Sequence, residues 1–188
     1  MALQQQLLNE ASVNKRNIEN QIITEEELIE PIYSINPTTG KIMRKSGSML
    51  LPHDVELQTR LDGSTETKED AVERLNSVHA QNSINALRSK IISDLLAQLE
   101  STGKEFFGNS KASLNFLKRR LNVQLQQING YFKPQYRNQK FINALVNSIP
   151  NSEKLEELYR KLALAQVDQD YASMMYQGLM GEYAIHQS

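Results

Sequence analysis

Hydrophobic residues recur at helical spacing over the longest uninterrupted stretch of the chain, residues 67–102, which contains neither glycine nor proline. Most of its apolar positions lie three or four residues apart and form one stripe along a helix: Val72, Leu75, Val78, Ile84, Leu87, Ile91, Leu95 and Leu99. Thr67, with Asp70 three residues on, can cap the start, and Gly103 stands where a left-handed C-terminal cap belongs. The pattern predicts one long helix over residues 67–102.

This helix is long for the size of the chain. At about 1.5 Å per residue it would span about 54 Å, whereas a compact chain of 188 residues has a radius of gyration near 16 Å and measures roughly 40 Å across. Other long helices or other subunits are then needed to cover its stripe. We therefore expect an elongated helical bundle.

The N-terminal part of the chain carries a weaker helical pattern. Residues 2–23 place Leu3, Leu7, Ala11, Ile18 and Ile22 on one side, which is typical of a peripheral helix or one that depends on a partner. The following residues 24–27 resemble a capping box. Because Pro31 comes soon after them, we expect only a short helical bend there.

Three more helices are predicted in the second half of the chain. Asn109 or Ser110 can cap a helix that ends at Gly130, and a short helix around residues 141–146 is closed by Pro150. The last helix is expected over residues 152–186. Its apolar stripe shifts near Asp168 and Asp170, which indicates a kink or a change of packing partner.

Between the first two helical stretches the apolar period changes from about 3.6 to two. Tyr33 and Ile35 alternate up to a turn that ends at Gly40, and Ile42 and Arg44 continue on the same face. This predicts a β-hairpin over residues 32–45 in which Ile35 lies opposite Ile42 and Tyr33 opposite Arg44. Residues 54–61 also alternate and are a possible third strand, although Pro52 followed by acidic residues equally suits the start of a helix.

Together these patterns predict a mainly α fold: an elongated bundle with long helices over about 67–102 and 152–186 and a small β-hairpin insertion. The length favours a single domain over residues 1–188, with the insertion at about 31–62.

The amino-acid composition argues against several classes of protein. The chain has no cysteine and therefore no disulfides or thiolate chemistry. It has no basic, apolar leader at its start and no apolar run of about 18 residues. We therefore expect no signal peptide and no membrane span, and a location in the cytoplasm or within an assembled particle. Asn and Gln supply 32 residues, many of them on predicted helices; this favours wet protein interfaces, or equally reflects genomic composition bias.

Charge is segregated although the net charge is −1. Residues 104–150 carry eight basic groups and one acidic group, and seven of the twelve aromatics lie between Phe106 and Phe141. The candidate contacts to phosphate or to an acidic partner are Lys118, Arg119, Arg120, Lys133, Arg137 and Lys140, and the candidate base-stacking residues are Tyr131, Phe132 and Tyr136. On the structural interpretation, Phe116 and Phe141 belong to the core and the basic face meets acidic helices of this chain or of a neighbour.

Catalytic and cofactor motifs are not found in the sequence. The three histidines lie far apart and have no cysteine to complete a zinc site, and there is no phosphate-binding or dinucleotide-binding loop. No serine has the frame of a nucleophile elbow. We expect a protein that is not an enzyme, with no cofactor, no metal site and no small-molecule substrate.

The C-terminal helix contains a methionine-rich region beside two glycines. Its candidate docking residues are Met174, Met175, Leu179 and Met180. Methionine adapts to irregular surfaces, so the region suits a partner, although ordinary core filling explains it as well.

These features favour a non-catalytic structural or adaptor subunit of a larger protein assembly, such as a phage or viral structural component or a secretion-type apparatus. Its partners would be other protein subunits in a homo- or hetero-oligomer. The alternative is a helical nucleic-acid-binding protein that uses the basic, aromatic-rich segment 104–140.

Overall fold

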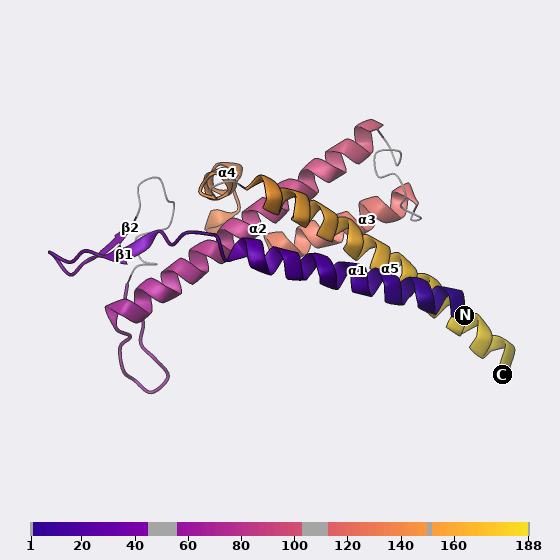
Figure 1. Ribbon diagram of the computed structural model, residues 1–188, viewed down its shortest axis with the longest axis horizontal. Helices are drawn as coiled ribbons and strands as arrows, with labels where there is room; N and C mark the ends of the chain where they lie inside the picture. Colours follow the sequence, from indigo (N-terminus) through magenta and orange to yellow (C-terminus); the bar gives the residue numbers. More distant parts are fainter. Residues whose placement is uncertain (1, 45–55, 103–112, 150–151, 188) are drawn as a thin grey trace. The chain divides into compact units, whose positions relative to one another are not determined.

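The computed structural model describes residues 2–44, 56–102, 113–149 and 152–187, with the side chains of residue 135 and of residues 179–187 left out. The chain is 74% helical and carries a small two-stranded antiparallel sheet, so the mainly α fold with a β-hairpin is confirmed (Figure 1). The elements in chain order are α1 (Ala2–Glu26), β1 (Tyr33–Ile35), β2 (Ile42–Arg44), α2 (Lys68–Thr102), α3 (Leu114–Asn129), the 3-10 helix η3 (Pro134–Tyr136), α4 (Gln139–Asn147) and α5 (Glu153–Gln187).

These elements form two compact units. Unit 1 comprises Met1–Glu27, Arg88–Gly130 and Ser152–Ser188, and unit 2 comprises Leu28–Leu87 and Tyr131–Asn151. Helix α2 contributes its first part to unit 2 and its second part to unit 1. The single domain and the elongated shape that the sequence indicates stay predictions.

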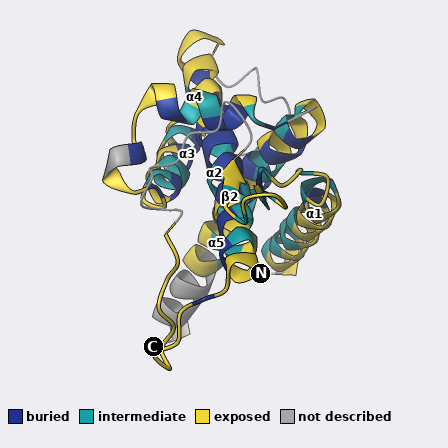
Figure 2. Cartoon of the chain, turned by 90° about the vertical axis from the view of Figure 1, so that its left-hand side faces the viewer, coloured by how far each residue is buried: buried dark blue, intermediate teal, exposed yellow. Residues whose placement is uncertain are grey.

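In unit 1, α1 and α3 both lie against α5. Ser12 bonds to Gln169, and Glu25 pairs with Lys154, so α1 and α5 run antiparallel. The buried hydrophobic residues of these helices are almost entirely aliphatic, and Figure 2 shows the buried positions in dark blue. Leu95, Leu121 and Val167 are at most 1% exposed. An aliphatic core is what a chain without tryptophan has to build.

Amide side chains join α5 to α1 and α3 in unit 1. The Gln169 Nε2 of α5 donates to Ser12 Oγ of α1 at 3.0 Å. Gln124 of α3 donates its amide to the carbonyl oxygen of Ala163 at 3.1 Å. A half-buried amide that finds partners in this way avoids the desolvation cost of an unpaired polar group. Part of the high Asn and Gln content thus holds helices together.

The β-hairpin of unit 2 has the predicted register, with Tyr33 opposite Arg44 and Ile35 opposite Ile42. Its turn is closed by a hydrogen bond from the Gly40 N–H to the Asn36 carbonyl at 2.8 Å, and Gly40 adopts φ +70°, which glycine tolerates best. The hairpin is anchored to α2 by Asn76: its Oδ1 accepts the backbone N–H groups of Ile32 and Tyr33, and its Nδ2 donates to the Tyr33 carbonyl.

The possible third strand is not present in residues 56–61, the described part of the range 54–61, and these residues are not helical either. Only Thr59 pairs, in a single antiparallel bridge with Thr65. A tight turn intervenes, in which Gly63 has φ +86° and the Ser64 N–H bonds to Asp62 Oδ1. This turn bounds the bridge on one side, and the start of α2 at Lys68 follows closely on the other.

The buried Glu66 holds this loop in place. Its carboxylate accepts the Gln58 N–H at 2.9 Å and pairs with Arg74 of α2 at 2.7 Å. These two interactions lower the pKa of Glu66 below its usual value, the Arg74 hydrogen bond having the larger effect.

Helix limits follow the sequence closely at some ends and not at others. Helix α2 begins as predicted, because the Thr67 hydroxyl accepts the Asp70 N–H at 3.1 Å. The predicted bend at residues 24–27 is wrong: α1 continues to Glu26, and its last turn is held by contacts with α5.

Helix α3 ends at Gly130 as predicted, but it begins at Leu114, later than the expected caps Asn109 and Ser110 indicate. Ser113 caps α3 through a bond to the Phe116 N–H, and Gly130 ends it at φ −65°, in the right-handed region. The expected caps Asn109, Ser110 and Gly103 lie outside the described residues, as does Pro150.

His79 is a buried polar residue of unit 2, only 3% exposed. Its Nε2 lies 3.4 Å from both the Ser83 and the Ser148 hydroxyl oxygens, while its Nδ1 has no partner among the described residues. Burial lowers the pKa of His79 below its ordinary value of 6.5. The imidazole is therefore neutral at physiological pH and serves to pack α2 against the Ser148 turn.

We expect the free energy of unfolding to fall as the pH is lowered from about 6.5, in part because of His79. Its pKa is depressed in the folded chain, so the unfolded chain binds the proton first and is favoured on acidification. His79→Gln keeps a side chain that can form hydrogen bonds but that does not bind a proton in this pH range. Denaturant unfolding at several pH values between 7.5 and 5 should show a shallower pH dependence for this variant. If the pH dependence of the unfolding free energy is the same in the variant, His79 does not contribute to it.

Candidate functional site

The candidate site is the exposed side of α5 between residues 168 and 178. Met174 is 44% exposed and Met175 is 39% exposed, and they flank the half-buried Tyr171 on the same side of the helix. We call Tyr171, Met174, Met175 and Gly178 the α5 ridge. The side chains of the other two candidate docking residues, Leu179 and Met180, lie outside the described part of the structure.

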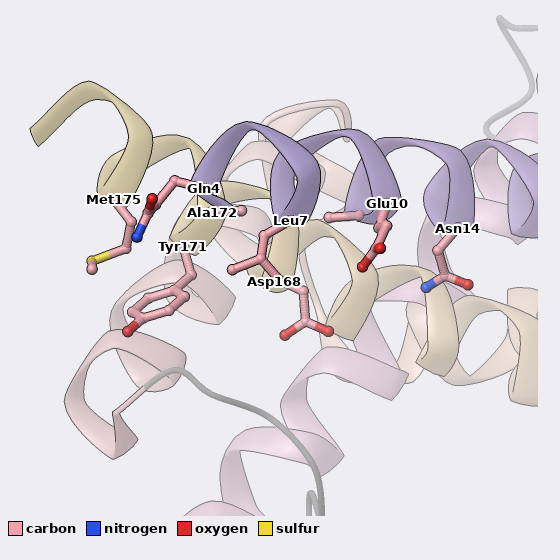
Figure 3. Close-up of a pocket in the computed structure, with 9 residues that line it drawn as sticks. Gln4, Leu7, Glu10, Asn14, Asp168, Tyr171, Ala172 and Met175 are labelled. Atoms are coloured by element: carbon pink, nitrogen blue, oxygen red, sulfur yellow. The ribbon is translucent and has the colours of Figure 1, made fainter. Parts of the chain in front are cut away.

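On one side of the ridge, α1 and α5 enclose a groove of about 270 Å³ (Figure 3). Its lining is Gln4, Leu7, Glu10, Ala11 and Asn14 from α1 and Asp168, Tyr171, Ala172 and Met175 from α5. Every charged residue in this lining is a carboxylate, and the other lining residues are apolar or uncharged. We call this hollow the acidic groove.

On the other side, α3 and α5 enclose a second hollow of about 340 Å³. Its lining is Phe116, Arg119, Arg120, Asp170, Ser173, Met174 and Gln177. Arg120 is paired with Asp170 at 3.0 Å, whereas Arg119 is exposed and lies over the Phe116 ring at 5.6 Å. Arg119 therefore gives the lining a net positive charge, and we call this hollow the basic hollow.

One aromatic pair forms the wall between the acidic groove and the basic hollow. The rings of Phe116 and Tyr171 meet edge to face, with centroids 5.6 Å apart and an interplanar angle of 77°. Phe116 is 7% exposed, which confirms its expected place in the core. Since such aromatic contacts are directional, the wall fixes α3 against α5 at the ridge.

The structure thus brings together candidates that the sequence treated separately. Arg119 and Arg120 share the basic hollow with Met174, while Met175 belongs to the acidic groove. Lys118, next to them on α3, is half-buried and does not line either hollow. No sequence signal for the acidic groove existed, because Glu10 and Asp168 are far apart along the chain.

Sequence reasoning also missed a third hollow of unit 1, of about 370 Å³, whose lining includes Tyr159, Glu26 and Arg88. The Tyr159 hydroxyl donates to the Glu26 carboxylate, and the Arg88 guanidinium lies 5.6 Å from the ring centroid. Burial, with the Glu26 hydrogen bond next, raises the pKa of Tyr159 well above its usual value. The phenol stays protonated at physiological pH, so this cluster works as a structural contact between α1 and α5.

The remaining candidates lie in unit 2, on the connection after α3 and on α4. Phe132 is 2% exposed and Tyr136 is 4% exposed, and the Tyr136 ring stacks on the buried Phe141 at 4.3 Å. Arg137 donates its Nε to the Phe132 carbonyl at 3.0 Å. The Phe132 and Tyr136 rings are therefore packed into unit 2.

Four candidates of unit 2 lie at its surface. Tyr131 is 65% exposed, and Lys133, Arg137 and Lys140 are also exposed. Tyr131 is the candidate stacking residue whose ring is accessible to a base.

Comparison with protein-family models, with curated proteins and with solved structures gives no match. Within the described residues, no helix combines the length and the apolar character that crossing a membrane requires.

Proposed function

We propose that this protein is a non-catalytic structural or adaptor subunit of a larger protein assembly and that it docks through the α5 ridge. The observation that carries the proposal is the exposure of two adjacent methionines between two hollows whose rims are charged. An apolar centre with a polar rim is the usual anatomy of a protein interface. Methionine suits such a centre because its flexible side chain adapts to the opposing surface.

The surrounding scaffold supports this role. Hydrogen bonds and ion pairs tie α5 to α1 and α3 just before the ridge, between Gln169 and Ser12 and between Asp170 and Arg120. At the start of the ridge, the Tyr171 ring contacts Phe116 of α3. The ridge is therefore presented on a braced helix, so docking orders few additional groups and loses little conformational entropy. A viral or phage particle or a secretion apparatus is the kind of assembly that such a subunit would serve, by analogy.

Charge substitution on the ridge tests the proposal. For the double variant Met174→Lys with Met175→Lys we expect loss of assembly, measured by native mass spectrometry of the purified chain and by cross-linking in extracts of the producing cells. Circular dichroism should show unchanged helical content, because both side chains are exposed. Val13→Lys is the matched control, since Val13 is 53% exposed on α1 and does not belong to the ridge.

The proposal would be overturned by either of two results. One is a wild-type chain that is monomeric, at 21.4 kDa, in both measurements. The other is a ridge variant that assembles as the wild type does.

The alternative is nucleic-acid binding by the basic segment, and the exposed Tyr131 is the observation that favours it. The burial of Phe132 and Tyr136 removes two of its three stacking platforms. Tight, salt-sensitive binding of a single-stranded oligonucleotide, lost in Tyr131→Ala and with assembly unaffected by the ridge variant, would promote this alternative.

A further inference from the structure

We propose that the partner on the α5 ridge is a second copy of this chain, bound about a two-fold axis parallel to α5 so that each acidic groove faces the other copy's basic hollow. This inference rests on the proposed docking role of the ridge and names its occupant.

The first argument is the placement of the hollows around α5. Successive helical residues are turned by about 100°, so Asp168 and Ala172 of the groove lie on nearly the opposite side of the helix from Asp170 and Gln177 of the hollow. The exposed ridge separates them. A surface with this layout has an apolar centre and two flanks of opposite charge.

The second argument is charge complementarity. The groove presents the exposed carboxylate of Glu10, while the hollow has Arg119 in addition to the Arg120–Asp170 pair. A two-fold axis along α5 places each carboxylate flank against an arginine flank. An axis across α5 would instead place carboxylates against carboxylates, which repel. A two-fold interface must be self-complementary, and the flanks are complementary in the parallel arrangement.

The third argument is Gly178, at the end of the ridge. Glycine is among the least favourable residues inside a helix, yet a Cβ added at Gly178 would meet no described atom within 4 Å. Packing within the described part of the chain would therefore tolerate a larger residue at position 178. A glycine at this position leaves room for a second α5 to approach closely. The sequence continues the ridge spacing at Gly181 and Ile185, and α5 runs on past the start of α1 (Figure 1).

Charge reversal with complementation tests the arrangement. Glu10→Lys reverses the groove and Arg119→Glu reverses the hollow; both side chains are exposed, so circular dichroism should confirm that each variant folds. By sedimentation equilibrium of the purified chain, we expect the wild type at twice 21.4 kDa. Each variant alone should have a dimer dissociation constant at least about tenfold higher. An equimolar mixture of the two should regain wild-type affinity, because its contacts are again between opposite charges.

Two results would overturn the inference. If each variant dimerises like the wild type, or if the mixture fails to regain affinity, the flanks do not face each other. If the purified wild-type chain is monomeric while the methionine variant still abolishes a larger assembly in extracts, the occupant is a different protein. In that last case the second copy is wrong and the docking role of the ridge stands.

Discussion

Replacing Asn76 by alanine should detach the β-hairpin from α2 and lower the free energy of unfolding by about 2 to 3 kcal/mol. Asn76 makes three hydrogen bonds to the backbone of Ile32 and Tyr33, at 2.8 to 3.1 Å. Each is worth about 1 kcal/mol, and the higher helix propensity of alanine offsets up to about 0.7 kcal/mol. Tyr33 is 3% exposed, so water cannot fully replace the lost partners.

Urea unfolding measures the loss in unfolding free energy of Asn76→Ala, and amide hydrogen exchange shows which part of the chain is destabilised. Exchange at Ile32 and Tyr33 should accelerate while the helices of unit 1 stay protected. Asn82→Ala is the matched control on the same helix, and its unfolding free energy should change by less than about 0.5 kcal/mol. Equal effects of the two substitutions would show that Asn76 is not an anchor.

Tyr159→Phe should destabilise unit 1 by about 2 kcal/mol. The substitution keeps the buried ring and its contact with Arg88 but removes the hydroxyl that donates to the Glu26 carboxylate. Hydrogen bonds to charged groups are stronger than neutral ones, and Glu26 is half-buried at the end of α1. We therefore also expect the last turn of α1 to fray.

Thermal or urea unfolding of the variant measures the loss in unfolding free energy. Faster hydrogen exchange of the backbone amides near Glu26 would report fraying of the last turn of α1. Tyr176→Phe provides the same chemical change on α5 at a half-buried position. Its effect should stay within about 0.5 kcal/mol. A Tyr159→Phe protein as stable as the wild type would mean that the Glu26 contact contributes nothing.

Several elements of this protein are determined by residues close together in the sequence. Helix α2 has the limits that Thr67 and an unbroken apolar stripe predict, and the hairpin has the register that its Asn36 to Gly40 turn imposes. In both cases the bonding groups lie within a few residues of each other. Local propensity and turn chemistry then act without help from the rest of the fold.

Other features depend on residues that the chain brings together from afar, and only the tertiary structure decided them. Glu26 is bonded to Tyr159, which extends α1 past its apparent stop, and Arg119 and Met174 line one hollow although they lie on different helices. Phe132 has the sequence context of a stacking residue and is nevertheless buried. Burial and charge pairing are set by which helix faces meet, and the weak stripes of α1 and α5 leave that choice to long-range packing.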